Sequence, residues 1–308
     1  MWALTEIARR HMAMAMLLLA MCAGSPGIAH AQQAFDTPET AMHAFGDAIA
    51  TRNDSAVQAL LGPGWRSVIP PLGAELRYRF LSAWSQAHAV QMEGADRARI
   101  TVGNDGWTLP IPLVRSNGRW HFDMRAGQNE MRLRRIGRNE LNTIQTMLAV
   151  YDAQREYAAG DHGPRGMTIY ASRLVSSPGK KDGLYWPSAP GEPVSPLGPA
   201  FIDATSKHTA AGGYHGYRYK LLTGQGPAAP GGAYSYQVNG MLFGGFAVLA
   251  WPVKYGESGI KSFIVNHDGQ VYERDLGADT AARAAAIDQF DPGPGWTKVP
   301  SQASAPLQ

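Results

Sequence analysis

Apolar residues recur at helical spacing in the first part of the chain, from residue 36 to about residue 88. Thr37 is placed to cap a helix that has Pro38 at its first position, and Asn53 precedes a second, shorter helix. A third helix is expected from Ala74 to His88. The inward positions predicted by this spacing are Met42, Phe45 and Ile49, then Val57, Leu60 and Leu61, then Leu76, Phe80, Ala83 and Ala87.

Strict alternation of apolar and polar residues replaces this spacing near Ile100. Turns are expected at 104–106 and 116–118, with alternating segments at 107–113 and 120–124 between and after them. Pro110 and Pro112 lack a donor N–H, so their strand should lie at an edge or pair irregularly. We therefore expect an α+β unit over residues 32–126, with three helices and an antiparallel sheet, loosely similar to the cone-shaped nuclear-transport-factor-2 fold.

A second unit is expected over 127–296, opened by a long helix from Asn139 to Ala159. The apolar stripe predicted for this helix is Leu141, Ile144, Leu148 and Tyr151. Gly and Pro are then frequent from 160 to 240, which favours loops over long helices. Antiparallel strands are predicted at 217–221, 234–238, 243–251, 260–265 and from 271, followed by a helix at 280–290 and a frayed tail at 297–308. The fold class is α+β in both units.

The first 31 residues have the pattern of a cleavable secretory signal. A basic stretch at Arg9 and Arg10 precedes an apolar run from Met12 to Met21, which is too short to span a bilayer, and 29–31 read Ala-His-Ala. Cleavage is expected before Gln32. Cys22 follows Met21 rather than the small residue of a lipoprotein signal, so lipidation is not expected. We predict an exported bacterial protein that resides in the periplasm.

Removal of that segment changes the composition in two ways. The chain has a single cysteine, so the mature form contains no thiol, disulfide or cysteine metal site. The segment carries Glu6, Arg9 and Arg10, so the formal charge falls from +3 to +2, which is too small to attract nucleic acid. No transmembrane segment, cofactor motif or paired histidine metal motif follows, and neither a cofactor nor a metal is expected.

Several longer motifs identify a family. They are Arg134–Leu141 (RRIGRNEL), Asp152–Tyr157 (DAQREY), Asp182–Pro187 (DGLYWP), Ser195–Pro199 (SPLGP), Gly244–Ala247 (GGFA), Ala250–Pro252 (AWP), Val271–Tyr272, Asp275–Gly277 and Asp279–Thr280. Together they resemble the bacterial domain-of-unknown-function family 2950 over the whole mature chain. The resemblance implies an exported envelope protein and supplies no activity or site residue.

A fainter resemblance concerns the second unit. A long helix with Ala153 and Tyr157, then a loop-rich segment, then 216–219 and 258–272, is similar to the globular heads of pilin-like and pseudopilin proteins. The resemblance implies a sheet wrapped on one helix. Pilins differ in having an apolar anchoring segment directly before that helix, which is missing here.

Motifs for nucleophilic chemistry are incomplete. Residues 256–259 read Gly-Glu-Ser-Gly, but the glycine that a nucleophile elbow requires next is Ile260. Ser177 and Lys180 have a penicillin-binding spacing with Pro-Gly between them, which prevents the necessary helix. The basic cluster Arg132, Arg134, Arg135 and Arg138 is expected to pair with Glu130, Glu140 or Asp123, with an anionic partner as the alternative.

Aromatic residues beside glycines form the candidate ligand surface: Tyr185, Trp186, Tyr214, His215, Tyr217, Trp251 and Tyr255. The alternative is that these rings hold loops against the sheet. We expect a non-enzymatic binding or scaffolding protein whose partner is an envelope component or another protein. The competing hypothesis is an envelope hydrolase for peptidoglycan or peptide, built from Asp182, His215 and Glu257.

Overall fold

The computed structural model describes residues 32–69, 71, 73–164, 167–199 and 213–300, so the predicted signal at 1–31, with Cys22, lies outside the described residues. The chain divides into two compact units, one up to Glu130 and one from Met131. The sequence placed this division between 126 and 127. Both units combine helices with antiparallel sheets, as the α+β prediction requires.

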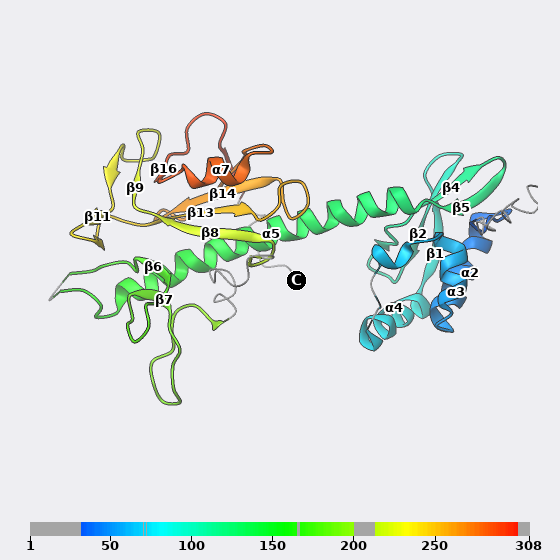
Figure 1. Cartoon of the computed structure of the whole chain (residues 1–308), viewed down its shortest axis with the longest axis horizontal. Helices are drawn as coiled ribbons and strands as arrows, with labels where there is room; N and C mark the ends of the chain where they lie inside the picture. The colour runs from blue at the N-terminus through cyan, green and yellow to red at the C-terminus, as the bar shows by residue number, and fades with distance from the viewer. Residues whose placement is uncertain (1–31, 70, 72, 165–166, 200–212, 301–308) are drawn as a thin grey trace, which may run out of the picture. The chain divides into compact units, whose positions relative to one another are not determined.

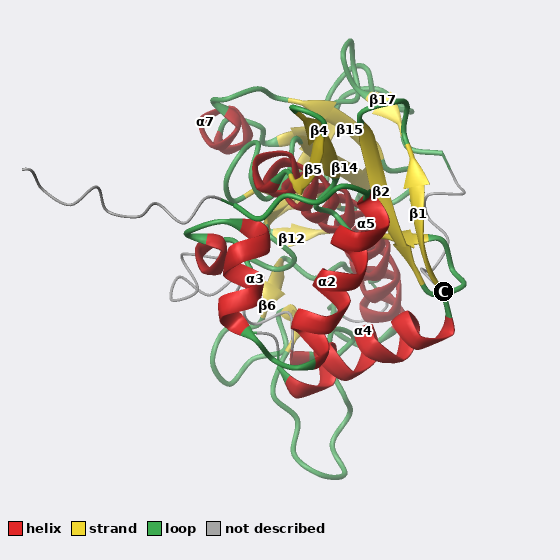
Figure 2. Ribbon diagram, turned by 90° about the vertical axis from the view of Figure 1, so that its right-hand side faces the viewer, coloured by secondary structure: helices red, strands yellow, loops and turns green. Residues whose placement is uncertain are grey.

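Helices cover one face of the sheet in the first unit (Figure 2). The cap positions follow the sequence, because the side chains of Thr37 and Asn53 accept the N–H groups of Thr40 and Ala56. The elements are α2 (Pro38–Ala50), α3 (Asp54–Leu61), a 3-10 turn (Trp65–Ser67), α4 (Ala74–Gln86), β1 (His88–Met92), β2 (Arg97–Val102), β3 (Trp107–Thr108), β4 (Leu113–Ser116) and β5 (Arg119–Phe122). Phe45, Leu60, Ile100 and Phe122 lie in their common core.

The sheet of the first unit runs β1-β2-β4-β5, and β3 pairs with β2 outside that order. The break between β3 and β4 falls at Pro110 and Pro112, which confirms the irregular pairing predicted there. Strand β1 was not predicted. The helix expected to reach His88 ends at Gln86, and His88 already pairs with Val102. Four of the five residues of β1 are exposed, so the strand has no alternation of buried and exposed residues that would predict it.

Helix α5 spans 36 residues, Met124–Ala159, and starts well before the predicted Asn139. The carboxylate of Asp123 accepts the N–H of Ala126 at 3.0 Å and so caps it. Its early turns are rich in Arg and Asn, which hides the helical stripe from a hydrophobicity pattern. The predicted stripe is partly wrong: Ile144 is buried, but Leu141 is 37% exposed. The buried stripe consists of Ile144, Met147, Val150, Ala153 and Tyr157.

The main sheet of the second unit lies against α5 (Figure 1) and has the order β17-β15-β14-β13-β8. Its strands are β8 (Tyr217–Leu222), β13 (Ala247–Pro252), β14 (Lys261–Asn266), β15 (Tyr272–Asp275) and β17 (Thr297–Lys298). Smaller pairs are formed by β6 (Arg173–Val175) with β7 (Gly183–Tyr185), by β11 (Gln237–Val238) with β12 (Met241–Leu242), and by β9 (Gly224–Gln225) with β10 (Tyr234–Ser235) and β16 (Gln289–Phe290).

Strand β13 lies inside the sheet, between β14 and β8, and is buried on both faces, as its apolar run predicts. Val248 and Ala250 belong to the cluster packed on α5, whereas Ala247 and Leu249 belong to the cluster on the opposite face. This alternation follows from the two-residue period of a strand. The sheet therefore separates two apolar cores, one packed on each of its faces.

The end of the chain differs from the prediction. The expected helix at 280–290 stops early, at α7 (Thr280–Ala285), and Gln289–Phe290 form β16, parallel to β9. Thr297–Lys298 pair with β15, and Val299 is 4% exposed, although the sequence analysis placed the start of a frayed tail at residue 297. Residues 301–308 of that tail lie outside the described residues.

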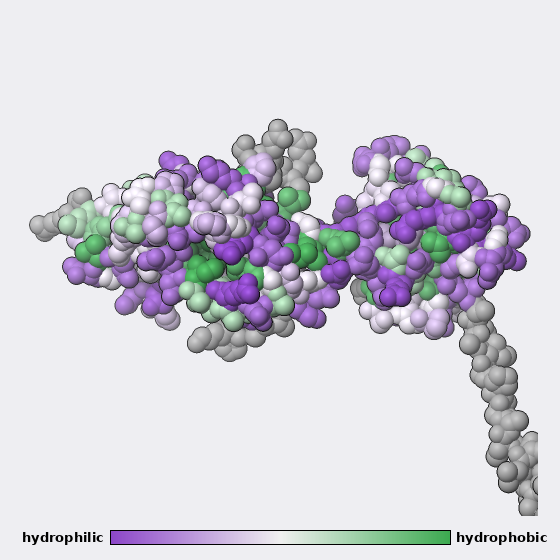
Figure 3. Space-filling view, turned by 90° about the horizontal axis from the view of Figure 1, so that it is seen from above, coloured by the Kyte–Doolittle hydropathy of each residue, from purple (hydrophilic) through white to green (hydrophobic). Residues whose placement is uncertain are grey.

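The surface of each unit is largely polar on the face that Figure 3 presents. The large apolar side chains that remain exposed include Leu76, Tyr78 and Met92 in the first unit and Val194 and Val238 in the second. Among the described residues, no helix combines the length and the apolar character that crossing a membrane requires.

Candidate functional site

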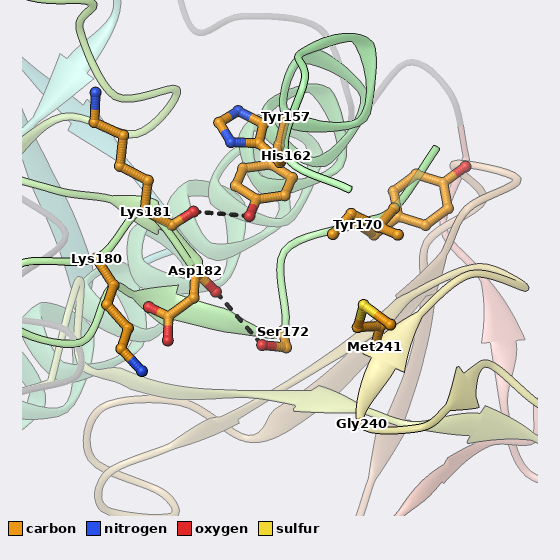
Figure 4. A pocket seen from close by; sticks show the side chains of 10 residues that line it. Tyr157, His162, Tyr170, Ser172, Lys180, Lys181, Asp182, Gly240 and Met241 are labelled. Carbon is orange, nitrogen blue, oxygen red and sulfur yellow. Dashed lines mark hydrogen bonds between the residues drawn. The ribbon is translucent and has the colours of Figure 1, made fainter. Parts of the chain in front are cut away.

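A pocket of about 300 Å³ lies at the carboxyl end of α5 in the second unit (Figure 4). It collects side chains from α5, from the segment between α5 and β6, from the connection between β6 and β7, and from the β11–β12 hairpin. Tyr170 and Met241 lie across the space from Asp182 and Ser172. The lining residues are Tyr157, His162, Ile169, Tyr170, Ser172, Lys180, Lys181, Asp182, Gly240 and Met241.

One end of the pocket is built on a stack of two rings. The imidazole of His162 lies parallel to the ring of Tyr157, with ring centroids 4.0 Å apart and planes 11° apart. The Tyr157 hydroxyl donates to the carbonyl of Lys181 at 2.8 Å, which ties the helix end to the β6–β7 connection. Burial and the neighbouring charge of Lys181 lower the pKa of His162. The imidazole is therefore neutral near pH 7.

Asp182 organises the wall next to this stack. Its carboxylate accepts the N–H of Ser177 at 2.7 Å and the hydroxyl of Ser177 at 2.9 Å, and Arg173 lies 3.6 Å away. Burial acts to raise the pKa of Asp182, but the two bonds from Ser177 and the charge of Arg173 outweigh it, so that its pKa lies below the ordinary value. The side chain remains one-third exposed and charged at neutral pH.

Two lysines project from this wall in different directions (Figure 4). The ammonium group of Lys181 lies over the ring of Trp186, 5.5 Å from its centroid. Lys180 extends on the side of Asp182 and Ser172. The pocket thus offers hydrogen-bonding groups of both charges on one side and an aromatic and thioether surface on the other. This combination suits a polar ligand that also has an apolar face.

The aromatic residues selected from the sequence do not form a single surface. Tyr185, Trp186, Tyr214 and Tyr217 pack in or against the core on α5, and Trp251 packs against the core on the other face of the sheet. Tyr217 is fully buried and donates to the carbonyl of Lys261.

The remaining two members of the set lie apart from the pocket lining. His215 contacts Tyr214, with ring centroids 4.2 Å apart. Tyr255 donates to Asp275 at 3.2 Å, in the connection between β13 and β14. Trp186 is 6% exposed, and its indole N–H donates to the carbonyl of Pro193. Trp186 and Tyr255 thus fasten loops, as the alternative interpretation of the sequence expects.

The residues of the hydrolase hypothesis are distributed along α5. Glu257 pairs with Arg135, and the His215 ring lies 3.4 Å from the Asn142 amide. Asp182 lies beside Tyr157 and raises its pKa, second to burial. At about 1.5 Å of rise per residue, their anchor points on the helix are about 10 and 20 Å apart. The three side chains do not converge on one substrate position.

The two serine motifs have structural roles. Ser258 lies in the turn that joins β13 to β14, where its hydroxyl bonds the backbone of Lys254. Ser177 donates to Asp182, and Lys180 completes a backbone turn with Ser177. Both observations agree with the interpretation of these spacings as coincidental.

Two arginines of the basic cluster, Arg132 and Arg135, bind the turn between β13 and β14 to α5. Arg132 donates to the carbonyl of Gly256, and Arg135 pairs with Glu257 at 3.1 Å. Glu130, one of the partners predicted for this cluster, pairs with Arg99 at 3.5 Å, and Glu140 instead accepts backbone N–H groups of the turn. The motif RRIGRNEL therefore has a structural explanation. Within the described part of the chain, no group of three or more potential metal-binding side chains is present.

Sequence reasoning missed most of the pocket. Asp182 was a candidate, but Tyr157, His162 and Met241 were not combined with it. Tyr157 and Asp182 each lie inside a family motif, DAQREY and DGLYWP, and this membership was the available signal. The position of Met241 depends on the β11–β12 hairpin and the bridge from Leu242 to Tyr170, which no local pattern predicts.

Fold and site define an α+β protein of two units with a small polar pocket beside the end of a long helix. The chain matches the model of a family described as protein of unknown function, DUF2950, over residues 32–299, and it belongs to that family. Neither the curated proteins nor the solved structures gave a match.

Proposed function

We propose that this is an exported, non-enzymatic binding protein of the bacterial cell envelope, acting in the periplasm. Its ligand site is the pocket formed by His162, Tyr170, Lys180, Asp182 and Met241. The ligand is a glycan-peptide unit of the cell wall, which carries hydroxyl, amide and carboxylate groups beside apolar sugar faces. The observation that supports this most strongly is the opposition of charged groups and an aromatic surface across the pocket.

Each part of such a ligand has a matching group. The ammonium group of Lys180, on the side of Asp182, is a donor for a carboxylate, and the Asp182 carboxylate accepts from a hydroxyl or an amide. Tyr170 and Met241 supply the surface for carbon-bound hydrogens. Because Ser177 holds Asp182 in place, little side-chain entropy is lost when it binds a ligand.

The alternative, an envelope hydrolase, requires an acid and a base at one reacting bond. The candidate set for that chemistry is held in separate contacts, with Glu257 on Arg135 of α5 and Asp182 on Ser177 of the β6–β7 connection. The binding hypothesis requires only the pocket. The resemblance of the second unit to pilin-like heads remains part of the proposal, as a scaffold of one helix and a sheet that presents loops.

Export has its own test. The protein is isolated from fractionated cells of its source, and the first residues are sequenced. A mature chain that begins at Gln32 in the periplasmic fraction is expected. An intact amino terminus in the cytosol would contradict the location and remove the cell-wall ligand from consideration.

Ligand binding is tested by retention of the chain from residue 32 on isolated peptidoglycan sacculi. The variant Lys180→Ala should bind at least about tenfold more weakly, because a charge-assisted hydrogen bond contributes about 1.5–3 kcal/mol and 1.4 kcal/mol is tenfold. The control Lys254→Ala removes the same charge at an exposed residue that does not line the pocket. Equal loss in both variants would show nonspecific charge attraction and contradict the site.

A further inference from the structure

Within the described residues, no strand pairs with the outer edge of the first unit's sheet. The sheet ends at β1, which pairs on its other side with β2. Glu93 donates its N–H to Arg97, and Gly103 donates its N–H to Ala87. In an antiparallel pair, residues that exchange such bonds alternate with residues that do not. Odd-numbered residues of β1 therefore direct their backbone groups toward β2.

It follows that His88, Val90 and Met92 direct their N–H and C=O groups away from β2, along the open edge. Figure 2 shows β1 at the margin of its sheet. Met92 is 49% exposed, and His88, Ala89 and Gln91 are exposed as well. Val90 is half-buried against the helices. This edge has the geometry of a strand that accepts another strand.

The strand also lacks the protection that free edges usually have. Lysine, proline and inward-pointing charges are common devices against edge pairing, and the segment His88–Met92 has none of them. The nearest charged residue, Glu93, is already paired with Arg97 and Arg99 at 3.0 and 2.5 Å. A strand laid along this edge therefore meets no uncompensated charge.

We infer that β1 pairs with β1 of a second copy of this chain, antiparallel, about a two-fold axis at Val90. In this register Val90 faces its counterpart and His88 faces Met92 of the other copy. Each such pair exchanges both backbone hydrogen bonds, so every outward group of the three residues is used. The Met92 sulfur then lies beside an imidazole that is already stacked on Trp84, with ring centroids 4.5 Å apart.

The partner is a second copy because the strand is complementary to itself. A two-fold interface places the same residues on both sides, so any charge near the axis would face its like. The sequence His-Ala-Val-Gln-Met, which has no Asp, Glu, Lys or Arg, satisfies that condition over its whole length. The dimer does not depend on the ligand pocket, which lies in the other unit.

Sedimentation equilibrium of the chain from residue 32 tests this inference. The wild-type protein should show a concentration-dependent monomer–dimer equilibrium. Met92→Lys, which places a charge at the edge, should shift it to monomer by at least about tenfold in Kd. The control Val238→Lys changes a residue that is 54% exposed in the second unit and should leave the equilibrium unchanged. A wild-type protein that stays monomeric at high concentration would overturn the inference.

Disulfide trapping supplies a second readout that does not depend on the folding of the lysine variant. Ala89 and Gln91 face one another across the proposed axis as a pair with closely spaced Cα atoms, about 4.5 Å apart, which a disulfide bridges. The only native cysteine is Cys22, in the predicted signal. Ala89→Cys/Gln91→Cys should form covalent dimers on mild oxidation. If the protein dimerises in solution but this cysteine variant forms no cross-link, the interface lies elsewhere and the β1 pairing is refuted.

Discussion

The Glu140 carboxylate accepts the backbone N–H of Lys261 at 2.9 Å, although the two residues are 121 positions apart in the sequence. The same oxygen accepts the N–H of Ile260 at 2.8 Å. Asn139 adds a bond from its amide to the carbonyl of Ser258. Asn139 and Glu140 of α5 thus bond the backbone N–H and C=O groups of the segment that leads into β14. This fixes the long helix against the sheet whose loops complete the second unit.

Loss of that carboxylate should destabilise the second unit. Glu140→Ala leaves two backbone N–H groups without their acceptor, and we expect a loss of about 1–3 kcal/mol in the free energy of unfolding. Glu140→Gln keeps an acceptor oxygen and should lose less. Urea denaturation measures the free energies, and hydrogen exchange at Ile260 and Lys261 locates the effect. Unchanged exchange at those two amides in Glu140→Ala would contradict this role.

Gln154 should be more sensitive still. Its side chain is fully buried, donates to the carbonyl of Ala171 at 2.9 Å and accepts the N–H of Ala171 at 2.8 Å. Gln154→Leu leaves a buried donor and a buried acceptor unpaired, so we expect a loss of about 2–6 kcal/mol. Arg155→Leu, at an exposed neighbouring position, is the control. Similar unfolding midpoints for both variants would refute the importance of this pair of bonds.

Two glycines should respond in opposite directions to alanine. Gly245 has φ of +146°, and a Cβ built there would lie 2.4 Å from Nδ1 of His267, so Gly245→Ala should destabilise the protein by about 1–3 kcal/mol. Gly137 lies within α5 with no atom near its Cβ position. Gly137→Ala should stabilise the helix by about 0.5–1 kcal/mol. Thermal unfolding compares the two variants. A change of melting temperature with the same sign in both would contradict the backbone conformations given for these glycines.

The titration of His162 reports on the pocket directly. Burial and the Lys181 charge lower its pKa below 6.5, so the native state binds protons less readily than the unfolded chain. The contribution of this histidine to stability is therefore present above pH 6.5 and is lost as the pH falls through the window below it. Lys181→Met should raise the pKa of His162, measured by NMR of the imidazole signals. Lys180→Met, whose ammonium does not contribute to this shift, should leave the pKa in place.

Local sequence patterns predicted the elements whose apolar residues recur with a clear period and pack inside their own unit. The caps at Thr37 and Asn53 and the buried run of β13 belong to this group, because burial there follows directly from periodicity. Helix α5 was predicted too short because its first turns are held by arginines that bond a distant turn, an interaction without apolar periodicity. Within the predicted part, the buried polar Gln154 interrupts the apolar stripe.

The pocket was predictable only in part. DAQREY and DGLYWP both supply a lining residue, yet the sequence gives no reason to place Tyr157 near Asp182. That proximity depends on the bond from Tyr157 to Lys181 and on the turn that Ser177 and Asp182 form. Aromatic residues beside glycines were selected instead, and several of them are core residues such as Tyr217, with no exposed surface. Residue type alone does not separate a ligand-binding ring from one that anchors a loop.

The most direct test of the proposed function is an NMR titration of the ¹⁵N-labelled chain from residue 32 with soluble glycan-peptide fragments of peptidoglycan. We predict chemical-shift changes that saturate and that concentrate at Ser172, Lys180, Asp182 and Met241, with little change at Tyr255. A spectrum that does not change, or shifts spread evenly over exposed lysines, would contradict the account.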